Sequence, residues 1–190
     1  MTRLTLICHA ATEAARAARF PDDEVIDDGS AVPPSFGPPI VASHWLTGPE
    51  QRARSTAAAL VGDRVIVVDP ELRDWNCGRW RGQTIVDLQR TEPTAVAAWL
   101  ADPAAAPHGG ESLLALLGRV EDWLGRQAAV KGKSAAFTHP AILRAAIVVA
   151  LGAGPAAFWR VDAQPLSRAR LSHDGRRWNL QSLVPPSHSL

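Results

Sequence analysis

Residues 4–12, LTLICHAAT, limit the possible folds of this chain more than any other stretch. Five apolar or β-branched residues lead directly into His9, and no charged residue follows until Glu13. Such a run predicts a buried β-strand that ends at a polar corner. Because ligands of open α/β sheets bind at the carboxyl ends of the strands, His9 is a candidate functional residue. The alternative interpretation is a structural histidine that caps the strand end.

Length and charge limit the class of protein. The 190 residues fit one domain of ordinary size, which we expect to cover residues 1–184 and to leave a flexible tail at 185–190. A formal net charge of +1 with 21% charged residues argues against a nucleic-acid-binding or membrane-binding surface. We therefore expect a small molecule as the partner, with a homodimer left open.

Cysteine content and the N-terminal sequence indicate the compartment. Cys8 and Cys77 are too few for a secreted disulfide framework, and their spacing has no metal-ligand pattern. The first predicted strand begins without a signal-peptide core, and no apolar run reaches membrane-spanning length. We therefore expect a cytoplasmic protein.

Strand and helix patterns alternate along the chain, which is typical of α/β proteins. After the first strand, strands are predicted at residues 41–46, 64–68 and 134–138, a hairpin at 169–172 and 178–183, and helices at 12–19, 50–60, 84–100, 112–130 and 142–151. Pro93 is expected to interrupt the helix at 84–100. Four prolines predict an irregular surface segment at 30–40.

A second histidine also follows a predicted strand. The strand at 134–138 ends in His139, so two strands are expected to deliver a histidine to the same edge of the sheet. The loop at 69–83 is rich in Trp, Arg and Gly, and long loops of compact α/β domains commonly carry functional sites. The two histidines and this loop therefore form the candidate site.

Five segments occur in an order that resembles one known family. They are the strand ending in His9, GPEQRARSTAAAL at 48–60, ELRDWNCGRWRG at 71–82, HGGES at 108–112 and AAFTHPAILRA at 135–145. This order is similar to that of the histidine phosphatase superfamily, which is phosphoglycerate mutase-like. Its pattern is Arg-His-Gly, Ser-Pro-Leu-x-Arg-Ala-x-x-Thr-Ala, Leu-x-Glu with Gly-x-Trp-Glu-Gly, Gly-Glu-Ser, and a late strand ending in His. The resemblance implies a three-layer α/β/α sandwich with a mostly parallel central sheet.

The resemblance also implies roles for four residues. His9 would be the nucleophile that attacks phosphorus to form a phosphohistidine. Arg52 would bind phosphate through its planar guanidinium, and His139 would donate a hydrogen bond to the transferring phosphoryl group. Asp74 stands where the family has a Glu, the general acid that protonates the leaving oxygen. No metal or other cofactor is implied, because cationic side chains stabilise the charge.

The chain departs from the family pattern at the first motif. Cys8-His9-Ala10 replaces Arg-His-Gly, so the first phosphate-binding arginine is absent. A charge-assisted contact of that kind contributes roughly 1.5 to 3 kcal/mol. Asp74 is also one methylene shorter than the family's Glu, so the loop must bring its carboxyl group closer.

Other arginines are candidates to replace the lost charge. They are Arg16, Arg19, Arg73, Arg79, Arg81 and Arg144, each of which could instead be a solvated surface residue. Arg73 and Arg79 flank Trp75 and Trp80, which suggests a wall of aromatic rings and cations suited to a flat substrate. Packing is the alternative interpretation of these two tryptophans. Packing is also the role that we expect for Trp45, Trp99, Trp123 and Trp159.

The position of Cys8 beside His9 raises further alternatives. Cys8 is a candidate substrate-binding residue, and a thiol next to an imidazole can act as a nucleophile when its pKa falls. A redox pair with Cys77 is a second alternative, and an inert buried thiol is the third.

Three functions remain open at this point. The first is a metal-independent phosphomonoesterase that acts on a small phosphorylated metabolite through His9. The second is a reuse of the fold for different chemistry or ligand binding on a less anionic substrate, because Cys8 replaces an arginine. The third is a non-catalytic binding or regulatory domain.

Overall fold

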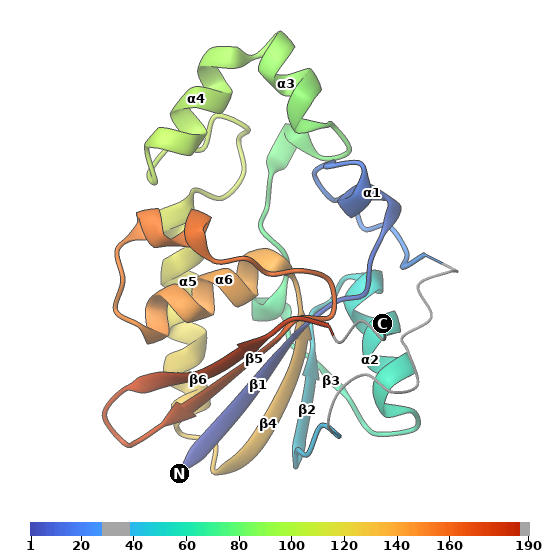
Figure 1. The fold of residues 1–190 in the computed structure, drawn as a ribbon, viewed down its shortest axis with the longest axis vertical. Coiled ribbons are helices and arrows are strands. Elements are labelled where there is room, and N and C mark those ends of the chain that lie inside the picture. Colours follow the sequence, from blue (N-terminus) through green and yellow to red (C-terminus); the bar gives the residue numbers. More distant parts are fainter. Residues whose placement is uncertain (28–38, 187–190) are drawn as a thin grey trace.

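The computed structural model describes residues 1–27 and 39–186 (Figure 1). These residues form a six-stranded sheet in the order β3-β2-β4-β1-β5-β6. The parallel strands are β1 (Thr2–Cys8), β2 (His44–Thr47), β3 (Val67–Val68) and β4 (Gly132–Thr138). An antiparallel hairpin, β5 (Arg168–His173) and β6 (Trp178–Val184), completes one edge. The predicted mostly parallel α/β sheet is confirmed.

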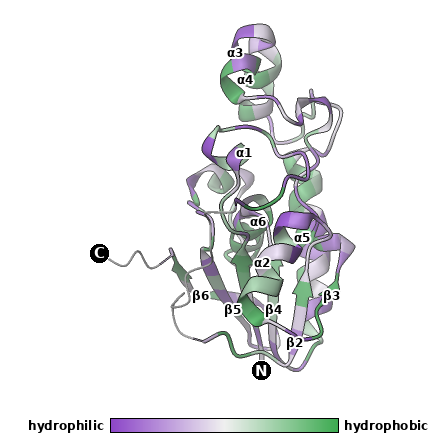
Figure 2. Cartoon of the chain, turned by 90° about the vertical axis from the view of Figure 1, so that its right-hand side faces the viewer, coloured by the Kyte–Doolittle hydropathy of each residue, from purple (hydrophilic) through white to green (hydrophobic). Residues whose placement is uncertain are grey.

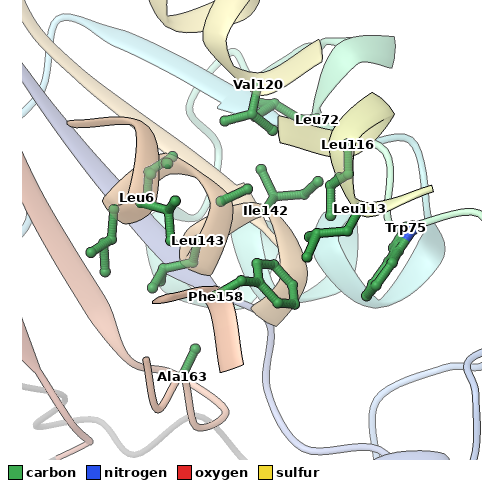
Figure 3. Packing of buried hydrophobic residues seen from close by; sticks show 14 of the residues in the cluster. Leu6, Leu72, Trp75, Leu113, Leu116, Val120, Ile142, Leu143, Phe158 and Ala163 are labelled. Carbon is green, nitrogen blue, oxygen red and sulfur yellow. The ribbon is translucent and has the colours of Figure 1, made fainter. Parts of the chain in front are cut away.

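Helices cover both faces of this sheet (Figure 1). Successive residues of a strand point to opposite faces, so Leu6 packs in the larger core cluster while Ile7 packs in a second cluster with α2 (Gln51–Val61). The larger cluster lies between the sheet, α5 (Leu113–Ala128) and α6 (Pro140–Ala150), as Figure 3 shows. Figure 2 shows that the central strands and α6 are mainly hydrophobic. The predicted three-layer sandwich is confirmed.

An excursion of the chain lies beyond the carboxyl ends of the parallel strands (Figure 1). It contains α3 (Ile85–Thr91) and α4 (Pro93–Ala101), in which Pro93 occupies the first turn of α4. Proline is suited to that position because its missing N–H would have no helical partner there. The predicted interruption at Pro93 is therefore confirmed. Short 3-10 helices η1 (Pro70–Leu72) and η2 (Gly78–Trp80) precede this region in the sequence, and a third, η3 (Pro155–Arg160), follows α6.

Two predicted elements are much shorter than expected. The helix predicted at 12–19 is a single turn, α1 (Glu13–Arg16), because Ala18 adopts a positive φ of 48° and Arg19 then pairs with Thr84. The strand predicted at 64–68 is reduced to β3, in which only Val67 and Val68 pair with β2.

Some expectations concern residues that the structure does not describe. The irregular segment predicted at 30–40 falls mostly outside the described residues, as does most of the predicted tail, from residue 187 onward. Within residues 1–27 and 39–186, no helix combines the length and the apolar character needed to cross a bilayer.

Candidate active site

Two buried histidines meet at the carboxyl ends of β1 and β4. The strands are adjacent and in register, with Cys8 opposite Thr138, and the His9 N–H donates to the Thr138 carbonyl (2.9 Å). The next residue of each strand is therefore a histidine at the same edge. The rings of His9 and His139 lie 5.4 Å apart, centroid to centroid, with 60° between their planes. The predicted convergence of the two histidines is confirmed.

The His9 ring is held in one tautomer. Its Nδ1 lies 2.7 Å from the Ala10 carbonyl oxygen. Because a carbonyl only accepts hydrogen bonds, Nδ1 carries the proton and Nε2 keeps its lone pair. Burial and the neighbouring His139 lower the pKa of His9 to about 4, so the ring is neutral near pH 7. His9 therefore has the protonation state of a nucleophile.

Arg52 lies in the first turn of α2 and is 1% exposed. Its Nη2 donates to Asp74 Oδ2 (2.6 Å), and its Nη1 lies 3.8 Å from Glu24 Oε2. Neither Nε nor Nη1 has a hydrogen-bond partner in the described part of the chain. A buried guanidinium with two open donors is suited to bind an anionic oxygen.

A hydrogen-bond relay fixes Arg52 relative to His9. The Ala10 N–H donates to Thr56 Oγ1 (2.9 Å), and that hydroxyl donates to the Arg52 carbonyl (2.7 Å). The first turns of α2 are thereby tied to the backbone that follows β1. Arg52 also lies close enough for its charge to lower the His9 pKa.

The carboxyl group of Asp74 lies between Arg52 and His139. Its Oδ2 accepts from Arg52 and lies 3.5 Å from His139 Nδ1, while its Oδ1 accepts from the Trp75 N–H (2.7 Å). Burial by itself raises the pKa of Asp74, but the His139 and Arg52 charges outweigh it and the net pKa is lowered. Asp74 is therefore a carboxylate when no ligand is bound.

Glu50 belongs to the site, and the sequence analysis missed it. Its Oε2 lies 2.7 Å from His139 Nε2, and its Oε1 accepts from the Asp74 N–H (3.0 Å). Burial raises the pKa of Glu50, but hydrogen bonding to His139 and to the Asp74 N–H makes the net pKa lower than usual. The Glu50 carboxylate can only accept, so His139 Nε2 must donate. This leaves His139 Nδ1, which has no hydrogen-bond partner among the described residues, on the Asp74 side.

Gly48 makes room for the contact between Glu50 and His139. A Cβ atom at position 48 would lie 2.8 Å from the Leu72 carbonyl oxygen and 3.0 Å from His139 Nε2. The sequence contained a signal for this arrangement. Gly-Pro-Glu at 48–50 stands where the family pattern has Ser-Pro-Leu, so a carboxylate replaces an apolar residue two positions before Arg52.

A cavity of about 240 Å³ opens over His9 and Asp74. Five aromatic side chains form one wall of it, those of Phe20, Trp75, Trp99, Phe158 and Trp159. Trp75 therefore lies where we expected it. Trp99 packs in the core as expected, but it also lines the cavity, as does Trp159, because the excursion that carries α4 and the segment of η3 both reach the strand ends. Trp80 is fully buried and does pack in the core.

Two of the predicted substrate-binding arginines lie elsewhere. Arg16 points away from the cavity, 63% exposed, and pairs with Asp27 (2.7 Å) because α1 ends after one turn. Arg79 is held by the Glu92 carboxylate and the Pro107 carbonyl on the outer side of the excursion. Arg19 and Arg144 line the cavity instead.

The prediction that Cys8 contacts substrate was also wrong. Alternate residues of β1 share a face, so the Cys8 side chain packs with Leu4 and Leu6 in the larger core cluster. It is fully buried, and burial raises the pKa of its thiol far above the usual range. Cys77 lines the cavity, and burial raises its pKa to about 12. Both cysteines are free thiols, and these pKa values do not favour a thiolate nucleophile.

Taken together, the fold and the site define an α/β protein in which two histidines, a buried arginine and a carboxylate meet at the end of a parallel sheet. The family model described as histidine phosphatase superfamily (branch 1) matches residues 31–185. The chain belongs to this superfamily, which confirms the resemblance seen in the motifs.

Individual relatives are more distant. A bifunctional protein of Mycobacterium tuberculosis is 32% identical over 140 residues, which cover 68% of this chain and 37% of the relative. The chain thus spans little more than a third of that relative's length. A phosphoserine phosphatase of Entamoeba histolytica has a similar structure (TM-score 0.82, 16% identity, 97% of each chain). An alpha-ribazole phosphatase of Shigella flexneri has a TM-score of 0.80, with 21% identity over 96% of each chain.

Proposed function

We propose that this chain is a cytoplasmic, metal-independent phosphomonoesterase that acts on a small phosphorylated metabolite through a phosphohistidine at His9. The observation that carries the proposal is the unblocked His9 Nε2 lone pair beside the two open donors of Arg52. Two of the structural neighbours, a phosphoserine phosphatase and an alpha-ribazole phosphatase, support the same class of substrate.

The proposed reaction has two steps at phosphorus. Arg52 Nε and Nη1 bind phosphoryl oxygens, His9 Nε2 forms a bond to phosphorus, and the bond to the leaving oxygen breaks. Asp74, which takes up a proton from solvent as the substrate binds, gives this proton to that oxygen. Water then attacks the phosphohistidine, Asp74 takes a proton from it, and the bond from phosphorus to His9 breaks to release phosphate. His139 Nδ1 lies 3.5 Å from Asp74 Oδ2, and in this proposal the transferring phosphoryl group lies within its reach.

Asp74 becomes an acid only when substrate is bound. In the free protein its carboxylate is stabilised by Arg52 and His139. A phosphate dianion on Arg52 competes for that stabilisation and adds a like charge, so both effects raise the Asp74 pKa. Substrate binding itself thereby prepares the proton donor.

One observation favours a second candidate function, the reuse of the fold for a less anionic ligand. The cations of the site already have carboxylate partners: Arg52 pairs with Asp74 and Glu24, and His139 contacts Glu50. Such a site attracts a dianion less strongly than one with unpaired cations.

The proposed function is tested by trapping the covalent intermediate. Wild-type protein is mixed with ³²P-labelled phosphomonoesters in EDTA and quenched within one turnover. We expect a base-stable, acid-labile protein label, together with continued phosphate release in EDTA. An absence of both label and release across a panel of primary-alcohol and aryl phosphates would overturn the proposal and favour the second candidate.

Replacement of Glu50 by Gln is expected to lower kcat/KM about 10- to 100-fold, as for the loss of one hydrogen bond to a charged group. An amide has only one acceptor oxygen, so it cannot serve both His139 Nε2 and the Asp74 N–H. Steady-state kinetics and the ¹⁵N resonances of His139 measure the effect, and a weakened Nε2 hydrogen bond is expected. Glu121→Gln on the exposed surface of α5 is the matched control. Unchanged kinetics in Glu50→Gln would contradict a positioning role for this residue.

A further inference from the structure

The cavity wall is a continuous set of aromatic rings. The Trp159 ring centroid lies 4.9 Å from that of Trp99, 5.1 Å from that of Phe158 and 6.1 Å from that of Trp75. Phe20, from the segment that follows α1, adds a further ring, whose centroid lies 5.6 Å from that of Trp99. Trp159 remains 38% exposed, whereas its partners are buried. An exposed indole at the mouth of a cavity is an apolar surface that a ligand can cover.

This wall provides few partners for a polar leaving group. The Trp75 indole N–H already donates to the Glu111 carbonyl (2.6 Å). Pro21, Pro140 and Ala141 add further apolar side chains, and Thr12 and Arg19 are polar members of the lining. Glu24 and Asp74 are engaged with Arg52. Hydroxyl or carboxylate groups placed against such a wall would lose their hydrogen bonds to water without replacement, which is unfavourable.

Arg144 provides the cavity with a cation of its own. Its guanidinium lies 5.9 Å from the Phe158 ring centroid, and its Nε has no hydrogen-bond partner in the described part of the chain. No described acidic side chain forms an ion pair with it. Its charge also acts on Cys8, the position at which the family pattern has an arginine. Arg144 thus brings a positive charge to the same end of the sheet from α6.

We infer that the substrate is a phosphomonoester of an apolar, ring-bearing alcohol, with the ring against Trp159 and the phosphate near Arg144. This inference rests on the proposed function. The cavity volume of about 240 Å³ is slightly below the roughly 300 to 1,000 Å³ of pockets that hold drug-sized ligands. A cavity of this size therefore fits a leaving group of one or two rings. Aromatic stacking on Trp159 selects the leaving group, and Arg144 contributes to the binding of the phosphate.

The test compares two esters of primary alcohols, 2-phenylethyl phosphate and glycerol 3-phosphate. Their leaving oxygens are chemically alike, so the ratio of their kcat/KM values reports binding of the ring. We expect wild type to favour the phenylethyl ester about 10- to 100-fold, as for the burial of one aromatic ring. A ratio near one, or a preference for the glycerol ester, would overturn the inference while leaving the phosphatase proposal intact.

Variants identify the surface that selects the ring. Trp159→Ala and Trp159→Leu are expected to reduce the ratio about tenfold or more, and Leu100→Ala, exposed on α4 outside the cavity, is the control. Arg144→Met is expected to lower kcat/KM for both esters about tenfold while keeping their ratio. An unchanged ratio in both Trp159 variants would overturn the placement of the ring.

Binding separates failure of the inference from failure of the proposed function. Calorimetry with 2-phenylethylphosphonate, which cannot be hydrolysed, measures recognition without turnover. If neither ester is hydrolysed but the phosphonate binds and Trp159→Ala weakens it tenfold, the phosphatase proposal fails and the ligand class stands. If the phosphonate and inorganic phosphate bind equally, the ligand class fails.

Discussion

Replacement of His9 by Ala is expected to reduce phosphate release from every phosphomonoester by on the order of 10⁴-fold or more, as for the loss of a covalent nucleophile. The structure offers no substitute. His139 Nε2 is engaged by Glu50, and the Cys8 thiol is buried on the other face of β1. Release is measured as inorganic phosphate under single-turnover and steady-state conditions. Retention of more than about one-hundredth of the wild-type rate would exclude the phosphohistidine route.

Loss of activity in this variant must be separated from loss of folding, and the pH dependence of stability provides the control. The His9 pKa is about 4 in the folded protein against 6.5 in the reference state. Between these values the unfolded chain binds the proton and the folded protein does not, so the free energy of unfolding falls as the pH falls. The loss is about 3 kcal/mol at pH 4 and is absent above pH 6.5. A folded His9→Gln protein lacks this contribution of His9 to the pH dependence. We therefore expect its free energy of unfolding, measured by denaturation at pH 7 and at pH 4.5, to differ less between the two pH values than that of wild type.

Replacement of Asp74 by Asn is expected to lower kcat/KM for an alkyl phosphate about 10²- to 10⁴-fold, as for the loss of a general acid, but to affect 4-nitrophenyl phosphate much less. An alkoxide needs a proton to leave, whereas 4-nitrophenolate does not. The measurement is kcat/KM for both esters in wild type and variant.

Asp74→Glu is the matched control for this prediction. It keeps the acid and restores the side chain of the family pattern, so we expect it to retain activity on the alkyl ester. An equal loss on both esters in Asp74→Asn would show that Asp74 acts by holding Arg52, through the 2.6 Å contact, and not by transferring a proton.

The sequence predicted the parts of the site that follow from strand patterns. His9 and His139 each end an apolar run, and adjacent parallel strands in register must present the residues that follow them at one edge. Arg52 was identified only through the family pattern. Its surroundings, with two open donors and two carboxylate neighbours, became visible only when residues from three separate segments were placed together.

The sequence was less informative about side chains whose role depends on contacts far away in the chain. In the sequence, Glu50 is only a residue near the start of a predicted helix. Its part in the site becomes evident from its contact with His139, which lies 89 positions later in the chain. Trp99 and Trp159 read as packing residues because helical spacing does not reveal which ring borders a cavity. Arg16 and Arg79 read as candidates for the site because the turns that direct them outward leave no clear pattern.

By itself, then, the sequence determined the α/β class, the order of the elements and the placement of His9 and His139, because hydrophobic periodicity and strand ends are local properties. The tertiary structure alone decided the tautomer of His9, the contact of Glu50 with His139, the position of Arg144 and the aromatic wall of the cavity. These depend on distances between segments far apart in the chain, and burial and charge act on a side chain through such distances.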